Sequence, residues 1–467
     1  MRKKEIQIPE VVPQPLSDVV TQERQYTLIT PLFGGGAIKG ERDEVTAVRG
    51  TEIRGQLRFW WRACYGGRYN TIEEMQRGED LLWGVAAKSK KDEKEKEGVE
   101  EKKENEKKPK ETTVQIMVEP IKVEDIKELP AYEIDKKGKP VPDFDIPGYA
   151  AFPLQPTSDG KPAKLIYKNV RFCLTISFPS NKQQEIRGAL WAWETFGGVG
   201  ARTRRGFGAI KLEGIMNVGY VQGEKIRKSV PAESLPIATT IGVKEWLKKE
   251  FLQFGIEKKA PEGVPSLSRQ MLDEQIYILL SFSKANQTWV SFRNVSEAWK
   301  TIVDKLRAFR QDKQWPDSRE IKKLKNADEG LPAQKYELLK APLGLPVVFH
   351  FPKEGKDADL TLQGGEEGHE RLSSPLILRP LLCQGEQYLG LVVLLENYAP
   401  HLENVQVMKK VDKELQKMPA IIETNLGVAS NKNISLLRGE KDVLRAFITY
   451  LQSPRQRNNQ NENRERR

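Results

Sequence analysis

One glycine- and arginine-rich segment constrains this chain more than any other. Residues 197–208 read GGVGARTRRGFG and follow directly on a tryptophan-bearing apolar stretch. Because glycine adopts positive φ angles and admits close backbone contacts, the segment predicts a tight loop between a helix and a strand. Its arginines at 202, 204 and 205 add guanidinium groups that suit phosphate or another anion. The structural alternative is a basic turn that binds nothing.

The segments around this loop alternate between strand and helix patterns. Their order, strand–helix–strand–strand–helix–strand, is typical of a ferredoxin-like domain. Two insertions interrupt it: a Pro/Gly-rich excursion at 140–162, and a Lys/Glu-rich stretch at 88–111 that we expect to be disordered because it has almost nothing apolar to bury. Strands are predicted at 26–33, 113–119, 170–178 and 207–215, and helices at 53–65 and 181–196.

The chain of 467 residues is longer than one hydrophobic core normally supports, so we expect more than one domain. We predict a first domain at 1–228, a connection at 229–270, a second domain at 271–451 and a disordered Asn/Arg-rich tail at 452–467. The second domain again shows a strand, a helix, several strands and a helix. Its strands are predicted at 275–283, 345–351, 375–382 and 388–395, and its helices at 295–310, 403–417 and 441–451.

Composition narrows the class of protein. Lys and Arg exceed Asp and Glu by 76 − 65 = 11, which favours a polyanionic partner such as nucleic acid. Three distant cysteines form no CxxC pair and three histidines form no metal-binding pattern, so we expect a reducing compartment and no metal site. Without an apolar leader or a membrane-length apolar run, the sequence predicts a cytoplasmic protein that does not bind a membrane.

The predicted helix at 53–65 carries a stripe of three arginines, Arg54, Arg58 and Arg62, at positions i, i+4 and i+8. Like charges on one stripe repel each other unless an anion lies there, so we predict phosphate contacts. The alternative is a solvated face neutralised by acidic neighbours from elsewhere in the fold. Lys39 and Arg49 precede this helix, whose N-terminus also favours phosphate.

In a domain of this order, the loop after the first strand and the loop before the fourth can meet at one end of the sheet. The two loops would then form one basic cleft. The chain has no P-loop, no paired carboxylates beside the basic loops and no histidine in the first domain, so we predict no catalytic residue, metal or cofactor. The candidate RNA-binding residues are Lys39, Arg49, Arg54, Arg58, Arg62, Gly197, Gly198, Gly200, Arg202, Arg204, Arg205, Gly206 and Gly208.

Four segments together resemble the CRISPR-associated RAMP superfamily, and within it the first-numbered Cmr subunit of type III-B effector complexes. They are TLITPLFGGG at 27–36, RGTEIRGQLRFWWRACYGG at 49–67, LWAWETFGGVGARTRRGFG at 190–208 and RLSSPLILRPL at 371–381. The resemblance implies two tandem ferredoxin-like (RRM-type) domains with insertions, an α+β fold. The insertion at 88–111 departs from the family pattern, and the sequence gives it no role.

The resemblance also implies a non-catalytic subunit of an antiviral ribonucleoprotein. Such a subunit would contact guide RNA and target RNA near the 3′ end of the guide, and would touch a neighbouring RAMP subunit of the Cmr complex. Target cleavage would belong to other subunits. Two alternatives stay open: a metal-independent endoribonuclease that processes precursor guide RNA, and a basic adaptor that binds only protein.

Overall fold

The structure is a computed structural model whose fold is mixed α+β with several sheets, in agreement with the predicted class. The chain divides into two compact units, one of residues 1–269 with 382–386 and the other of residues 270–381 with 387–467. The described residues are 18–38, 40–43, 46–85, 114–157, 160–221, 224–240, 242–283, 287–326, 334–351, 359–365, 370–397, 404–411, 414–424, 434–440 and 442–452.

A five-stranded antiparallel sheet organises the first unit, with strand order β2-β7-β1-β8-β9. Helix α1 follows β1, and α5 connects β7 to β8. The strands of this unit are β1 (Val19–Leu28), β2 (Gln115–Ile121), β3 (Lys127–Pro130), β4 (Tyr132–Ile134), β5 (Pro140–Pro142), β6 (Leu165–Lys168), β7 (Arg171–Pro179), β8 (Ile210–Val221) and β9 (Glu224–Ser229). Its helices are α1 (Gly50–Tyr65), α2 (Ile72–Trp83), α4 (Gly148–Ala151), α5 (Gln183–Phe196) and α6 (Val243–Phe254).

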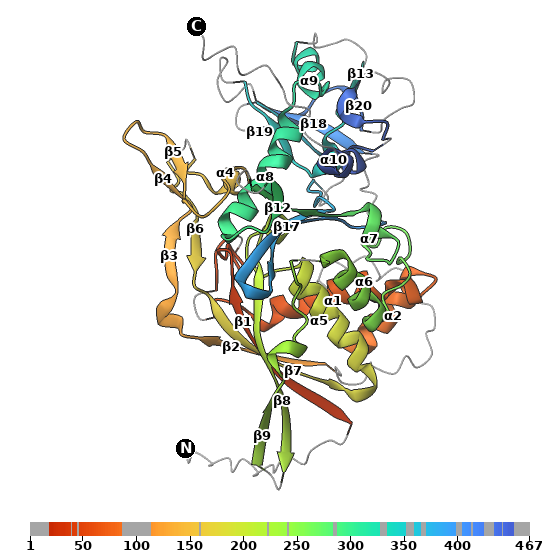
Figure 1. Ribbon diagram of the computed structural model, residues 1–467. Coiled ribbons are helices and arrows are strands. Elements are labelled where there is room, and N and C mark those ends of the chain that lie inside the picture. Colours follow the sequence, from red (N-terminus) through yellow and green to blue (C-terminus); the bar gives the residue numbers. More distant parts are fainter. Residues whose placement is uncertain are drawn as a thin grey trace, which may run out of the picture. The chain divides into compact units, whose positions relative to one another are not determined.

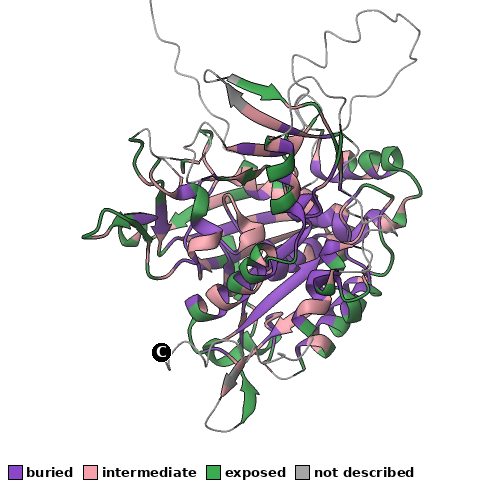
Figure 2. Ribbon diagram, turned by 90° about the horizontal axis from the view of Figure 1, so that it is seen from above, coloured by how far each residue is buried: buried purple, intermediate pink, exposed green. Residues whose placement is uncertain are grey.

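The core of the first unit lies between this sheet and a layer of helices. Strand β7 alternates buried and half-buried residues, so Phe172, Leu174, Ile176 and Phe178 all face the same side. Figure 1 shows α1, α2, α5 and α6 gathered on one side of the sheet, with the β8–β9 hairpin extending beyond it. Buried residues follow the inner strands and helix faces, and exposed residues lie on the outer turns (Figure 2).

The first strand differs from its prediction in both bounds. β1 starts at Val19 and ends at Leu28, because the chain beyond it leaves the ladder and bonds elsewhere. Leu32 pairs with Tyr167 through two backbone hydrogen bonds of 2.9 Å, and the carbonyl of Phe33 accepts from Ala201 N at 2.7 Å. The residues after β1 therefore tie the sheet to the glycine-rich loop rather than extending the strand.

Residues 229–269, which the sequence predicts as part of a connection, group with the first unit. Helix α6 lies within this stretch and packs against α5. The Trp191 ring is 5.6 Å from the rings of both Phe251 and Phe254, measured between centroids. Leu247 and Phe251 are fully buried. An apolar helix face that packs this closely is part of a core, which is why these residues do not behave as a linker.

The second unit contains several smaller sheets. Helix α8 packs on a three-stranded sheet of order β10-β17-β16, and a four-stranded sheet has the order β14-β15-β18-β19. The strands are β10 (Ile276–Leu279), β11 (Ser281–Ser283), β12 (Thr288–Val290), β13 (Gln334–Glu337), β14 (Val347–Phe349), β15 (Leu360–Gly364), β16 (Leu376–Cys383), β17 (Gln387–Leu394), β18 (Val405–Val411), β19 (Glu414–Lys417) and β20 (Ala420–Glu423). The helices are α7 (Met271–Glu274), α8 (Val295–Gln311), α9 (Asp317–Lys325) and α10 (Val443–Gln452).

The helix predicted at 403–417 is wrong. Its described residues form β18 and β19, an antiparallel pair that extends the sheet from β15. Val405 and Val407 alternate along β18 and are both buried, which is the period of a strand. Within the described part of the chain, no helix is long and apolar enough to cross a membrane.

Candidate nucleic-acid interface

Two glycine loops that lie far apart in the sequence meet in the first unit, as predicted from the order of its elements. One is residues 31–36, which follow β1 and include three consecutive glycines, and the other is residues 197–208, before β8; we call their contact the loop junction. Backbone hydrogen bonds hold it together, from Ala201 N to Phe33 O at 2.7 Å and from Gly208 N to Pro31 O at 2.9 Å. The two loops therefore form one structure at this end of the sheet.

The glycines of the second loop are required by backbone geometry. Gly200, Gly206 and Gly208 all have positive φ, at +84°, +89° and +59°. A Cβ atom at Gly200 would lie 2.6 Å from Phe33 O, and one at Gly208 would collide with Val199 O. These glycines let the loop pack against its own protein, so their immediate role is to build the junction.

The first two glycines of the loop pack against indole rings. A Cβ atom at Gly197 would lie 2.6 Å from Trp60 Nε1. The carbonyl of Gly198 accepts a 3.0 Å hydrogen bond from Trp193 Nε1. Gly197 therefore lies against α1 and Gly198 against α5, so the start of the loop is fixed on both helices.

Glu52 lies at the centre of the junction, in the first turn of α1. Its Oε1 accepts from the backbone N–H of Gly200, and its Oε2 is buried with no hydrogen-bond partner among the described residues. Burial raises the pKa of this carboxyl to about 7, against the lowering effects of the Gly200 hydrogen bond and the Arg49 charge. The junction thus contains an acid whose charge changes near neutral pH.

Four of the predicted basic residues surround the junction and already contact the protein. Arg49 Nε donates to Gly35 O at 3.0 Å, and Arg202 Nε donates to Ala150 O at 2.8 Å. Arg204 lies over the Phe59 ring at 5.5 Å, and Arg205 donates to the Arg204 carbonyl at 3.2 Å. All four are half-buried, so part of each side chain still reaches solvent.

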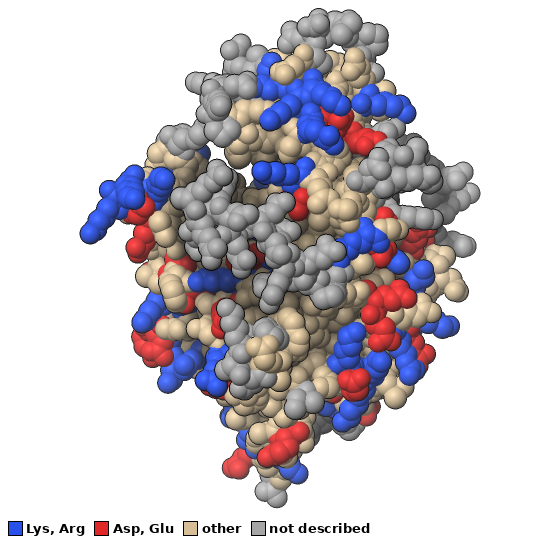
Figure 3. Space-filling model, turned by 45° about the horizontal axis from the view of Figure 1, so that its top comes forward, with Lys and Arg blue, Asp and Glu red and all other residues tan. Residues whose placement is uncertain are grey.

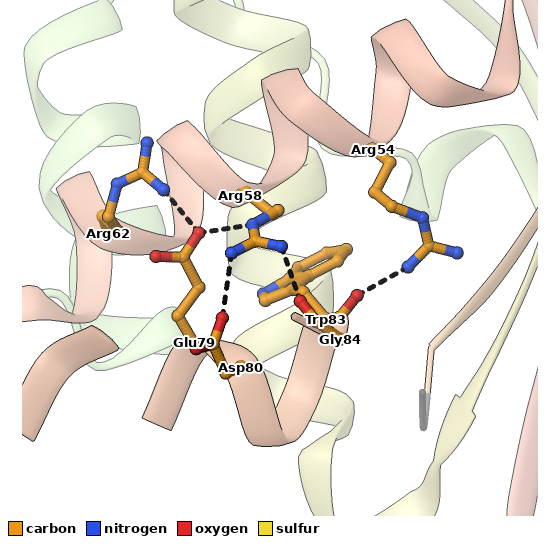
Figure 4. Close-up of polar contacts among 7 residues, drawn as sticks. All are labelled: Arg54, Arg58, Arg62, Glu79, Asp80, Trp83 and Gly84. Carbon is orange, nitrogen blue, oxygen red and sulfur yellow. Dashed lines mark hydrogen bonds and ion pairs between the residues drawn. The ribbon is translucent and has the colours of Figure 1, made fainter. Parts of the chain in front are cut away.

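The arginine stripe of α1 receives its counter-charge from α2 (Figure 4). Arg58 donates to Glu79 Oε1 and to Gly84 O, both at 2.6 Å, and to Asp80 Oδ1 at 3.2 Å. Arg62 also contacts Glu79 Oε1. The structure therefore has the acidic-neighbour arrangement that was the alternative to phosphate contact.

Arg54 completes the stripe by donating to two carbonyls, Trp83 O at 2.9 Å and Val114 O at 3.1 Å. Helix α2 thus supplies the acidic side chains and one of the carbonyls that the three arginines of the stripe bind. The sequence could have indicated the start of α2, because Thr71 and Glu74 have the spacing of a capping box. In the structure, the Thr71 side chain accepts a hydrogen bond from Glu74 N. RNA contact by these three arginines stays a prediction.

Lys39, the remaining predicted basic residue, lies outside the described residues. Of the three histidines in the chain, His369 and His401 also lie outside them. His350 is described, and its Nδ1 is 2.6 Å from Asp359 Oδ2 in the second unit. No group of three His, Cys, Asp or Glu side chains that could hold a metal occurs in the part of the chain that the structure describes.

Charge on the surface is mixed. On the face drawn in Figure 3, blue basic side chains are interspersed with red acidic ones over much of the described surface. On this face, the described basic side chains therefore do not form one continuous patch. Any phosphate contact has to be argued from particular side chains.

One part of the chain is similar to a known protein family. Residues 25–211, a stretch that contains both glycine loops, match the family model of the RAMP superfamily. No curated protein matches the chain in sequence.

The chain is also similar to solved structures of Cmr proteins. One is Cmr1 from Pyrococcus furiosus in its apo form, with 18% identity, a TM-score of 0.46, and coverage of 82% of this chain and 90% of that one. Two others are chains from structures of the Type III-B Cmr-beta bound to cognate target RNA. Both are 12% identical over 93% of this chain, with TM-scores of 0.43 and 0.41 and coverage of 99% and 100% of those chains.

Proposed function

We propose that this protein is a non-catalytic RNA-binding subunit of a type III-B CRISPR ribonucleoprotein effector complex. In this role it contacts guide RNA, target RNA or both near the 3′ end of the guide, and a neighbouring RAMP subunit. The proposal rests on the RAMP match at 25–211 and on the resemblance of residues 371–381 in the second half.

The observation that supports RNA binding most directly is the loop junction. The RAMP match covers both loops, and Arg49, Arg204 and Arg205 surround their contact with guanidinium groups that are only half-buried. Guanidinium groups can form paired hydrogen bonds with phosphate oxygens. The junction is therefore the place where we expect an RNA backbone to bind.

The proposal includes two tandem ferredoxin-like domains. In the first unit, the order β2-β7-β1-β8, with helices after β1 and between β7 and β8, supports this assignment. In the second unit, α8 follows β10, α10 comes after β17, and the sheet order is β10-β17-β16. These three strands and two helices support a second copy of the same plan, to which the smaller sheets are additions.

The test is RNA binding by the full chain with a charge reversal at the junction. Arg204→Glu should weaken binding of single-stranded RNA by about tenfold, or ~1.4 kcal/mol, because a charged phosphate contact is lost and a repulsion is added. Arg204→Lys keeps the charge and should retain most of the affinity. Unchanged affinity in Arg204→Glu and in Arg49→Glu would overturn the assignment of the junction.

One observation keeps the nuclease alternative in view: the contact of His350 with Asp359, which is the arrangement of a general base and its orienting carboxylate. Incubation with repeat RNA without metal separates the two functions. We expect no fragments. Specific cleavage that disappears in His350→Ala would favour the nuclease, and absence of RNA binding at both low and moderate salt would favour the protein-only adaptor.

A further inference from the structure

An acidic side chain, Glu52, lies inside a junction that we expect to bind an anion. It belongs to the first turn of α1, and its Oε1 accepts the backbone N–H of Gly200 in the second glycine loop. Gly35 of the first loop is also close to it, because a Cβ atom there would be 3.0 Å from Glu52 Oε2. One carboxyl group therefore contacts both loops of the junction.

The two oxygens of this carboxyl differ in their hydrogen bonding. Oε1 is bound to Gly200 N, whereas Oε2 is buried and has no partner among the described residues. Burying a charged oxygen without a partner favours the neutral acid. A proton on Oε2 would remove the charge and leave Oε1 free to accept from Gly200 N, so the two loops can stay joined in both protonation states.

Arg49 links Glu52 to the RNA that we expect at the junction. Burial raises the pKa of Glu52 to about 7, while the Gly200 hydrogen bond and the positive charge of Arg49 act to lower it. Arg49 is half-buried, and its Nε donates to Gly35 O at 3.0 Å. It is also one of the arginines that we expect to bind phosphate. A phosphate at Arg49 would therefore compete with Glu52 for the same positive charge.

The other charged side chains of the surrounding elements have contacts elsewhere. Arg42, after the first loop, is 3.8 Å from Glu128, and Asp43 accepts from Thr46 N at 3.0 Å. The arginines of the second loop each contact a backbone carbonyl or an aromatic ring: Arg202, Arg204 and Arg205. All three histidines of the chain belong to the second unit. Among the described charged groups, Arg49 is thus the one whose charge acts on Glu52.

We propose that RNA binding at the loop junction protonates Glu52, so that the junction binds RNA more tightly as the pH falls through neutrality. This inference rests on the proposed function, since it requires RNA at the junction. A phosphate on Arg49 neutralises the charge that favours the carboxylate and adds a negative charge of its own. Both effects favour the neutral acid, so the RNA and a proton taken up from solvent each strengthen the binding of the other.

The experiment measures the affinity of the full chain for a single-stranded RNA octamer at several pH values from 6.0 to 8.0 and at constant ionic strength. The octamer carries no terminal phosphate, because the second pKa of such a group is about 6 and it would itself titrate. Affinity should fall about fivefold over this range, within the limit of tenfold per pH unit that uptake of one proton sets.

Glu52→Gln should remove this pH dependence, because glutamine is neutral at every pH and keeps an oxygen for Gly200 N. The variant should bind RNA at pH 8.0 about as tightly as the wild type does at pH 6.0. Glu133→Gln changes an exposed carboxylate on β4 and should retain the pH dependence of the wild type. Thermal melting of each variant checks that the fold is retained.

Two arginine variants test the link through Arg49. Arg49→Gln should weaken RNA binding and also flatten its pH dependence, because Glu52 then loses the cation that favours its charged form. Arg204→Gln should weaken RNA binding and keep the pH dependence, since the charge of Arg204 does not act on Glu52. A fivefold pH effect that persists in Arg49→Gln would contradict this link.

Calorimetry on the wild type gives a measurement that needs no variant. RNA binding at pH 7.5 in two buffers of different ionisation enthalpy counts the protons taken up, and we expect about half a proton per chain. No proton uptake, an affinity that does not change with pH, or a pH dependence that persists in Glu52→Gln would overturn the inference and leave the proposed function intact. Absence of RNA binding at every pH would overturn both.

Discussion

At the scale of single residues, Glu52 couples the loop junction to the proton concentration. Its carboxylate holds Gly200 N, and burial raises its pKa to about 7 from an ordinary value of 4.5. The folded state therefore holds a proton between these two pH values that the unfolded state releases. The stabilisation is complete below pH 4.5 and is lost as the pH rises through about 7.

We predict that Glu52→Gln removes this pH dependence. Between pH 4.5 and pH 7.5, the free energy of unfolding of the wild type should fall relative to the variant by up to about 3 kcal/mol, because one pKa unit corresponds to about 1.4 kcal/mol. Urea unfolding followed by tryptophan fluorescence at several pH values measures this. Glu133→Gln, an exposed carboxylate on β4, is the control. A constant difference between wild type and Glu52→Gln at all pH values would contradict the role of Glu52.

The junction glycines give a second residue-scale prediction. Gly208→Ala should lower the free energy of unfolding by more than about 2 kcal/mol, since its φ is +59° and the new Cβ would meet Val199 O. Gly214→Ala on β8 is the matched control, because its Cβ would meet nothing within 4 Å. Thermal melting of both variants decides the matter, and equal melting temperatures would contradict the packing described for this loop.

At the scale of elements, the contact between α1 and α2 depends on Arg58. The guanidinium binds Glu79, which is 3% exposed, and also Asp80 and Gly84 O. Removing one partner of a buried ion pair leaves the other uncompensated, so Arg58→Ala should cost about 3 kcal/mol of unfolding free energy. Arg58→Glu should cost more, because it adds a third carboxylate to this cluster.

The control for Arg58 is Arg77→Ala, which removes an exposed arginine from α2 itself and should change stability by less than about 0.5 kcal/mol. Urea unfolding gives both values, and RNA binding by the same proteins distinguishes two roles. If Arg58→Ala unfolds like the wild type but binds RNA weakly, the stripe contacts RNA rather than α2. We expect Arg58→Ala to be less stable than the wild type, and the RNA affinity of its folded fraction tests whether Arg58 also contacts RNA.

Most elements of the fold are predictable from local pattern, and the failures have local causes. The periods of residues 53–65 and 170–178 predict α1 and β7 almost to their ends. The stretch 403–417 is rich in Lys, Glu and Gln, which favour helices, but its pairing with β15 decides its structure. A prediction made from a short stretch of sequence cannot show that the stretch pairs with a strand far away in the chain.

The candidate site was predictable in outline and not in its partners. Element order alone predicts that the two glycine loops meet. The charges opposite the arginine stripe come from α2, whose residues 72–83 carry both a capping signal and the acids Glu79 and Asp80. Glu52 is one acid among many in the sequence, and only the fold shows that its Oε2 is buried. Burial of a single oxygen depends on long-range packing, so no local pattern reveals it.

At the scale of the whole molecule, mixed surface charge predicts how salt affects RNA binding. On the face drawn in Figure 3, acidic side chains are interspersed with the basic ones, so we expect a small set of phosphate contacts rather than one continuous basic surface. For single strands, each contact contributes about 0.7 to the slope of log affinity against log salt concentration. Arg204→Glu should therefore reduce that slope by about 0.7. Lys313→Glu makes the same charge change at an exposed position of the second unit and should leave the slope almost unchanged. Filter binding across a range of salt concentrations measures both. Equal loss of slope in the two variants would mean that overall charge, and not the loop junction, attracts the RNA.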